Sequence, residues 1–402
     1  MSIMTAPMST PEPDQSDREN LIKVPITADL LHGVVELEQT ERGVRPHRLP
    51  GWARAQTADP QLAMVEAQTS GVRLVFRTTA DVVELEVLPT KVVYPGAPPR
   101  PGVRYHLVVD GELRAETEAA AGNVLSVDLA TGSSRLEPGP SHTLRFDDLG
   151  PAPKTVEIWL PYGEVSELIE LRSDAPIVPV TDDRRRWVHH GSSISHGSNA
   201  DGPTTIWPVV AARGGDVNLT NLGLGGGALL DPFIARTVRD LPADLISIKL
   251  GINLTNADLI RMRAFTPAVH GYLDTIRDAH PDTPLLLISP IYCPIHEDTP
   301  GPGAPQFRED GTIAFVATGD PAEVAQGKLT LNTIRDELGR IVQQRGAADP
   351  QLHYLDGRRL YGPDDHDELP LPDNLHPDPA THRRIGERFT EIVFGAGGPF
   401  AG

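Results

Sequence analysis

The second half of the chain alternates between short strand-like stretches and longer helical ones, and this alternation restricts its fold more than any other feature. The strand-like stretches have the length of buried strands, and the segments between them are long enough for helices. A strand followed by a helix, repeated in this way, predicts a parallel sheet covered by helices on both faces. The expected pairs are residues 187–190 with 204–213, 217–219 with 231–239, 245–250 with 265–279, 284–289 with 328–345, and 352–355 with 380–394.

Polar and glycine-rich motifs follow the first three expected strands. Ser193 comes after the first strand in Gly-Ser-Ser-Ile-Ser-His-Gly, Gly226 after the second in Asn-Leu-Gly-Leu-Gly-Gly, and Asn253 after the third in Gly-Ile-Asn. Ligand sites of parallel sheets lie beyond the carboxyl ends of the strands. We therefore expect these three residues to lie at one edge of the sheet.

A fourth motif, Asp373-Asn-Leu-His376-Pro, lies close to the C-terminus. Serine, histidine and aspartate are the parts of an activated oxygen nucleophile, because a serine hydroxyl is inert at neutral pH until a base takes its proton. The base works best when a third group holds its ring in the right tautomer. A glycine N–H and an asparagine amide can both donate to the negative charge that develops on a carbonyl oxygen.

Together, and in this order, the four motifs resemble the four blocks of the SGNH hydrolases, also called GDSL-type esterases, over roughly residues 185–395. The resemblance implies that Ser193 is the nucleophile, that His376 is the general base and that Asp373 orients the histidine. It also implies an oxyanion hole made by the backbone N–H groups of Ser193 and Gly226 and by the side chain of Asn253. Such chemistry needs no metal and no organic cofactor.

Two positions depart from the family pattern. The usual aspartate before the nucleophile is Ser192, and the usual aspartate after the third-block asparagine is Leu254. Neither position carries the proton relay, but Ser192 leaves a choice between two serines. We prefer Ser193, because Ser193-Ile-Ser matches the family's Ser-Leu/Ile-Ser/Thr. Each motif taken alone could be a helix cap or a turn, and the catalytic interpretation depends on their joint occurrence.

The first half of the chain has the pattern of strands. Asp110-Gly111 is a strong hairpin turn between two strand-like runs. Short strands with turns between them and no long helical run predict an antiparallel, jelly-roll-like β-sandwich. The expected runs are residues 71–77, 83–87, 105–109, 112–114, 143–146, 155–160 and 165–171.

A chain of 402 residues suits two domains. We expect a disordered tail at residues 1–21, the sandwich at 22–178, and a flavodoxin-like α/β/α hydrolase domain at 179–402, with the linker at 173–185. This order resembles carbohydrate esterase family two, whose members remove acetyl groups from sugars. The predicted activity is removal of short acyl groups, such as acetyl, from a polar or carbohydrate-like alcohol.

Three alternatives remain open. An acyltransferase, or a thioesterase or lipase of longer chains, would use the same serine chemistry. A carbohydrate-binding protein with a retired catalytic domain is suggested by Ser192 and Leu254.

The net charge and composition of the chain limit the kinds of molecule that it is expected to bind. The chain has 36 Lys and Arg against 55 Asp and Glu, a net charge of −19, which argues against nucleic acid or an anionic membrane as a partner. We expect a small-molecule ester as the partner and leave an oligomer open. The first twenty residues have no apolar core of signal-peptide length, and no stretch approaches the ~18 apolar residues of a membrane helix, so we expect a cytoplasmic protein.

Other conspicuous side chains have structural interpretations. The histidines near Ser193 and the run His296-Glu-Asp lack a zinc-ligand spacing, so we expect no metal there. Cys293 is expected to be a packed small hydrophobe, and a single cysteine allows no intrachain disulfide. Trp159, Trp187 and Trp207 are expected in the core, and Trp52 at the surface. The loop at 290–303 should wall the site, and the long segment at 303–325 is typical of a lid.

Overall fold

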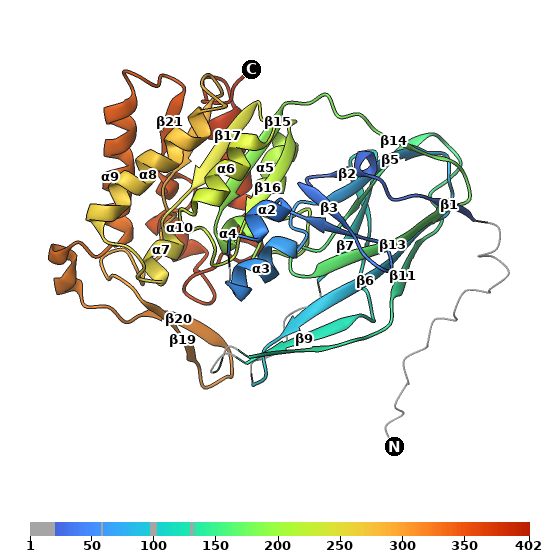
Figure 1. Ribbon diagram of the computed structural model, residues 1–402, viewed down its shortest axis with the longest axis horizontal. Helices are drawn as coiled ribbons and strands as arrows, with labels where there is room; N and C mark the ends of the chain where they lie inside the picture. The colour runs from blue at the N-terminus through green and yellow to red at the C-terminus, as the bar shows by residue number, and fades with distance from the viewer. Residues whose placement is uncertain (1–20, 58, 97–102, 129–130, 132) are drawn as a thin grey trace.

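The computed structural model describes residues 21–57, 59–96, 103–128, 131 and 133–402, so nearly all of the predicted tail lies outside the described residues. A sheet-rich N-terminal region is followed by a C-terminal region built on a parallel sheet (Figure 1). The predicted boundaries at residues 22–178 and 179–402 stay a prediction.

Five parallel strands form the C-terminal sheet, in the spatial order β16-β15-β17-β18-β21. In chain order this is 2-1-3-4-5, the flavodoxin-like arrangement, which confirms the predicted fold. The strands are β15 (Arg186–Gly191), β16 (Asn218–Gly223), β17 (Leu245–Lys249), β18 (Leu285–Ile288) and β21 (Leu352–Leu355). β15 and β16 run in register from Arg186 opposite Asn218 to Gly191 opposite Gly223, so both end at the same edge.

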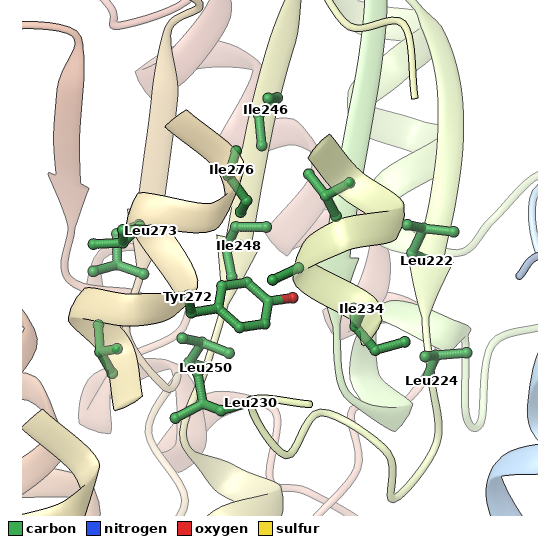
Figure 2. Packing of buried hydrophobic residues seen from close by; sticks show 14 of the residues in the cluster. Leu222, Leu224, Leu230, Ile234, Ile246, Ile248, Leu250, Tyr272, Leu273 and Ile276 are labelled. Atoms are coloured by element: carbon green, nitrogen blue, oxygen red, sulfur yellow. The ribbon is translucent and has the colours of Figure 1, made fainter. Parts of the chain in front are cut away.

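Helices cover both faces of this sheet. On one face, Ile246 and Ile248 of β17 pack with α6 (Pro232–Asp240), α8 (Met262–Arg277) and α9 (Leu331–Arg345). Figure 2 shows Tyr272 of α8 lying against Ile248 and Leu250. On the other face, Leu245 of β17 shares a core with α5 (Trp207–Gly214) and α11 (Pro379–Phe389). The side chains of β17 alternate between these two cores because successive strand residues point to opposite faces.

Two sheets form the predicted β-sandwich in the N-terminal region. One has the order β10-β9-β6-β13-β4-β3 with β1 and β11 attached, and the other has β14-β5-β12-β7-β8 with β2 attached. Buried apolar residues of both sheets, such as Leu74 and Val87, form one core. The predicted hairpin turn is confirmed, since Asp110 and Gly111 both have positive φ and join β7 to β8. The strands are β1 (Ile22–Val24), β2 (Leu31–His32), β3 (Glu36–Gln39), β4 (Val44–His47), β5 (Arg73–Thr78), β6 (Val83–Val93), β7 (Tyr105–Val109), β8 (Glu112–Thr117), β9 (Asn123–Val127), β10 (Ser134–Glu137), β11 (His142–Phe146), β12 (Lys154–Trp159), β13 (Val165–Ser173) and β14 (Ile177–Pro179).

One pair of the sandwich differs from the antiparallel prediction. β6 and β9 are parallel, with Thr90 opposite Asn123. The β7–β8 hairpin between them belongs to the other sheet, so the chain returns to the first sheet in the direction of β6. The remaining strand pairs of both sandwich sheets are antiparallel among the described residues.

Two helices of the N-terminal region were not expected from the sequence. These are α2 (Gly51–Arg54) and α3 (Pro60–Ala67), which lie against the C-terminal region (Figure 1). Leu62 and Val65 of α3 belong to the same apolar core as Leu222 of β16. The only local signal for α3 is the cap, in which the Asp59 carboxylate accepts a hydrogen bond from Gln61 N before an N-terminal proline. Both helices are too short for a clear apolar period.

The long segment expected to be a lid contains a β-hairpin, β19 (Gly303–Phe307) and β20 (Ile313–Ala317), between β18 and α9. The chain also contains α4 (Ser193–His196), α7 (Ile252–Asn256) and α10 (Pro363–Glu368). In the part of the chain that the structure describes, no helix is both long and apolar enough to cross a membrane.

Candidate active site

Two adjacent serines follow β15, Ser192 as the N-cap of α4 and Ser193 as its first residue, and they have different surroundings. The hydroxyl of Ser192 caps α4 by accepting a hydrogen bond from Ile194 N at 3.4 Å, and this residue is buried. The Oγ of Ser193 lies 3.0 Å from Nε2 of His376. The serine preferred from the sequence is therefore the one that lies within hydrogen-bond reach of the predicted base.

Asp373 and His376 lie in the loop that precedes α11. Nδ1 of His376 is 2.8 Å from Oδ2 of Asp373, while Oδ1 accepts hydrogen bonds from the backbone N–H groups of Leu375 at 3.0 Å and His376 at 2.7 Å. Burial acts to raise the pKa of Asp373, but the hydrogen bonds from His376 and the backbone outweigh it and hold this pKa below its usual value. The ionised carboxylate favours a proton on Nδ1, which leaves the Nε2 lone pair for Ser193.

The glycine-rich turn, residues 223–227, begins at the last residue of β16 and passes beside the nucleophile. A methyl group on Gly223 would lie 2.5 Å from the backbone N of His196, so only glycine allows this close approach to α4. A methyl group on Gly225 would lie 3.8 Å from Cβ of Ser193. Gly226 follows with φ of +77°, a backbone conformation that glycine adopts at little cost.

The three predicted oxyanion donors have free hydrogens. Oδ1 of Asn253, in α7, accepts a hydrogen bond from Ala228 N at 3.1 Å, which fixes the amide and leaves its Nδ2 hydrogens for another acceptor. Among the backbone hydrogen bonds of the described residues, none has the N–H of Ser193 or Gly226 as its donor. These three groups therefore remain available to donate, as the predicted oxyanion hole requires.

The β19–β20 hairpin contacts the loop that carries the predicted base, and this contact was not predicted from the sequence. Phe315 N donates to the carbonyl of Asp373 at 2.8 Å, and the Asn374 amide donates to the carbonyl of Phe315 at 3.2 Å. The Phe315 ring meets the His376 ring edge-on, with centroids 5.6 Å apart. The Arg308 guanidinium donates to the carbonyl of Pro372 at 3.0 Å.

Arg48 ties the N-terminal region to the glycine-rich turn, and it was also missed. Its guanidinium is fully buried and donates to the carbonyls of Asn221 at 3.1 Å and Gly223 at 2.5 Å. The same side chain donates to the carbonyls of Gln68, at 2.6 Å, and Val65. Burial lowers the pKa of Arg48 to about 9, so the group is still charged at neutral pH. An arginine in a loop has no local signature, and the Asn221 and Gly223 carbonyls that it holds lie more than a hundred residues away in the sequence.

The histidines that suggested a metal have other partners. His189 bonds the hydroxyls of Ser195 and Ser247, each within 2.8 Å, and His190 bonds the carbonyl of Leu222 at 2.8 Å. His296 bonds Asn256 at 2.7 Å, and Glu297 pairs with Arg335. Within the described ranges, no group of three or more His, Cys, Asp or Glu side chains is placed to hold a metal ion.

The interpretations of Cys293 and of the tryptophans are confirmed. Cys293 is buried, its thiol donates to the carbonyl of Asn374 at 3.3 Å, and burial raises its pKa to about 12. Trp159, Trp187 and Trp207 are buried, whereas Trp52 is 40% exposed.

The chain is similar to known proteins in sequence and in fold. Residues 190–384 match the GDSL-like lipase/acylhydrolase family. A solved structure of the salicylyl-acyltransferase SsfX3 from a tetracycline biosynthetic pathway is 29% identical, with a TM-score of 0.75 over 92% of this chain and 95% of that one. No curated protein sequence matches the chain.

More distant structures share the fold. A putative GDSL-like lipase from Bacteroides ovatus ATCC 8483 is 19% identical, with a TM-score of 0.67 over 93% of this chain and 97% of that one. A family two carbohydrate esterase from Cellvibrio japonicus is 12% identical, with a TM-score of 0.54 over 92% of this chain and 96% of that one. Residues 190–384 therefore match a GDSL-like lipase/acylhydrolase domain, and the chain shares the fold of the family two carbohydrate esterase structures, with a sheet-rich region before the parallel sheet.

Proposed function

We propose that the protein is a serine-dependent carboxylic ester hydrolase that removes short acyl groups, such as acetyl, from a polar or carbohydrate-like alcohol. The observation that carries this proposal is the hydrogen-bonded series from Ser193 Oγ to His376 Nε2, at 3.0 Å, and from His376 Nδ1 to Asp373 Oδ2, at 2.8 Å. This series supplies a nucleophile, a base and a group that orients the base.

In the proposed first step, Nε2 of His376 takes the proton of Ser193 as Oγ attacks the ester carbonyl carbon. The carbonyl oxygen becomes an oxyanion, which accepts hydrogen bonds from the N–H groups of Ser193 and Gly226 and from the Asn253 amide. The bond from carbon to the alcohol oxygen then breaks, and His376 gives its proton to the leaving alcohol. An acyl group remains on Ser193.

In the second step, His376 takes a proton from water, whose oxygen attacks the acyl carbon. The bond to Ser193 Oγ breaks, the serine regains its proton from the histidine, and the acid leaves. Asp373 stays ionised throughout and stabilises the positive ring.

The class of substrate is proposed from architecture. Solved structures of family two carbohydrate esterases share the fold of this chain, and one from Clostridium thermocellum holds cellohexaose. The chain has few aromatic residues, 4 Trp, 7 Tyr and 9 Phe, which favours a short acyl group over a long apolar one.

A second candidate function is acyl transfer, in which an alcohol replaces water in the second step. It is favoured by the 29% identity to a salicylyl-acyltransferase across nearly the whole chain.

The test is the turnover of p-nitrophenyl esters of increasing acyl length, with released p-nitrophenol and free acid measured together, with and without a sugar or glycerol as acceptor. A hydrolase releases one acid per nitrophenol and is fastest with acetate. A fall in free acid below nitrophenol when the acceptor is present would assign the transferase instead. No turnover of any ester by the folded protein would contradict both candidates.

A further inference from the structure

Helix α3 of the N-terminal region lies along the glycine-rich turn that carries Gly226. A methyl group on Gly227 would lie 2.9 Å from Cδ1 of Leu62, and one on Gly225 would lie 3.7 Å from Cγ1 of Val65. Gln61, in the first turn of this helix, donates a hydrogen bond from Nε2 to the carbonyl oxygen of Gly225 at 3.2 Å. The N-terminal region thus contacts the turn through an amide as well as through apolar packing.

The Gly225 carbonyl and the Gly226 N–H belong to one peptide unit. A trans peptide is planar, so its C=O and N–H point in opposite directions. A donor that holds the oxygen therefore fixes the direction of the N–H on the other side. A hydrogen bond to the oxygen also polarises the unit and makes the N–H a stronger donor.

We propose that Gln61 is a positioning residue for the oxyanion hole, and that it acts by holding the Gly225–Gly226 peptide so that the Gly226 N–H faces the developing oxyanion. This inference rests on the proposed function. Gln61 does not touch the reacting atoms in this account, and its effect passes through the peptide.

The turn needs such a hold because it is rich in glycine. Gly226 has φ of +77°, and the hydrogen bond from Gly227 N to Leu224 O, at 3.0 Å, spans this peptide without fixing its plane. Among the described residues, Gln61 is the donor within reach of the Gly225 oxygen. A methyl group on Gly226 would meet Gln61 alone, 3.6 Å from its Cγ, so the two residues face each other across open space.

Three substitutions test the proposal. Gln61→Ala removes the donor, and we expect kcat to fall about tenfold, or about 1.4 kcal/mol in the barrier, with KM within about twofold of the parent. Gln61→Glu has the same shape but presents an acceptor to the Gly225 oxygen, so kcat should fall at least as far. Gln61→Lys returns a donor on a side chain long enough to reach, and it should recover most of kcat.

Gln56→Ala is the matched control. Gln56 is also a glutamine of the N-terminal region that bonds the C-terminal region, because its Oε1 accepts from Arg236, yet it does not contact the glycine-rich turn. It should keep the parent kcat. A trifluoromethyl ketone, which forms an oxyanion on the serine, should bind Gln61→Ala and Gln61→Glu more weakly by the factor that kcat/KM loses, and Gln56→Ala normally.

The outcomes separate this inference from the proposed function. An active parent in which Gln61→Glu keeps the parent kcat overturns the role of Gln61 alone. A loss confined to KM also overturns it, because Gln61 would then contact the substrate. A parent that turns over no ester overturns both.

Discussion

At the scale of single residues, the catalytic proposal depends on the hydrogen bonds that link Ser193, His376 and Asp373. Ser193 and His376 were found from short motifs because a nucleophile and its base need particular residue types after particular strands. Gln61 and Arg48 could not be found in this way, because each acts through backbone carbonyls more than a hundred residues distant. A carbonyl is present at every position, so the sequence carries no mark of these contacts.

The two ends of the Asn253 amide have different proposed roles: Oδ1 holds the backbone at Ala228, and the Nδ2 hydrogens donate to the oxyanion. Asn253→Asp keeps the Oδ1 that accepts from Ala228 N but removes the donor hydrogens. One oxyanion donor is commonly worth ~3 kcal/mol, so kcat should fall about a hundredfold or more, and circular dichroism checks that the variant is folded. Asn256→Asp, in the same helix, alters an amide whose oxygen bonds His296 and should leave kcat unchanged. Parent-like turnover by Asn253→Asp would remove Asn253 from the oxyanion hole.

Glu164 should make stability depend on pH. Its side chain is buried, Oε2 has no hydrogen-bond partner within the described residues, and burial raises its pKa to about 7. The folded state then binds this proton more tightly than the unfolded state, whose pKa is the usual 4.5. The stabilisation is fully present below the unfolded value and is lost as pH rises from there to about 7.

Glu164→Gln should therefore be more stable than the parent at pH 8, by up to roughly 3 kcal/mol, and should gain little at pH 4. Urea unfolding at both pH values measures this difference. Glu112→Gln, on the exposed face of β8, is the control and should follow the parent. An equal effect of Glu164→Gln on the free energy of unfolding at both pH values would show that titration of the Glu164 carboxyl does not cause the pH dependence of stability.

At the scale of elements, the parallel sheet was predicted well because five short strand-like stretches alternate with segments long enough for helices. The sandwich was predicted as a class, but the β6–β9 pair is parallel and several strands were missed. β3 and β10 are short and polar, and their pairing depends on neighbours that local pattern does not show. The hairpin of β19 and β20 was expected only as a long loop.

This hairpin gives a prediction about the base loop. Phe315→Ala removes the ring that meets His376 but keeps the backbone hydrogen bond to Asp373. We expect kcat to fall about three- to tenfold, since a looser histidine samples fewer reactive geometries, with a small change in melting temperature. Phe307→Ala, on the other strand of the same hairpin, is 58% exposed and should have no effect. Equal activity of both variants would show that the ring does not position His376.

At the scale of the whole molecule, the two regions share an apolar core and a buried arginine. Leu49, Leu62 and Val65 pack with Leu222, and Arg48 donates to carbonyls of both regions. The glycine-rich turn therefore depends on the N-terminal region for its position, whatever that region also binds. The cytoplasmic location stays a prediction from the sequence, which left open whether the protein forms an oligomer.

Shared packing predicts that the two regions unfold together. Calorimetry of the parent should show one transition, and Arg48→Met should lower its stability by at least about 3 kcal/mol, because several buried carbonyls lose their donor. Arg213→Met removes another arginine that crosses between the regions, to the carbonyl of Gly111, but at an exposed position, and should change little. Two separate transitions in the parent would contradict a shared core.

The central claim is that Ser193, activated by His376, is the nucleophile. Labelling with a fluorophosphonate, followed by peptide mass spectrometry, tests it most directly. We predict one adduct per chain, on Ser193, formed at the parent rate in Ser192→Ala and far more slowly in His376→Ala. An adduct on Ser192, or no adduct on the folded parent, would contradict the account.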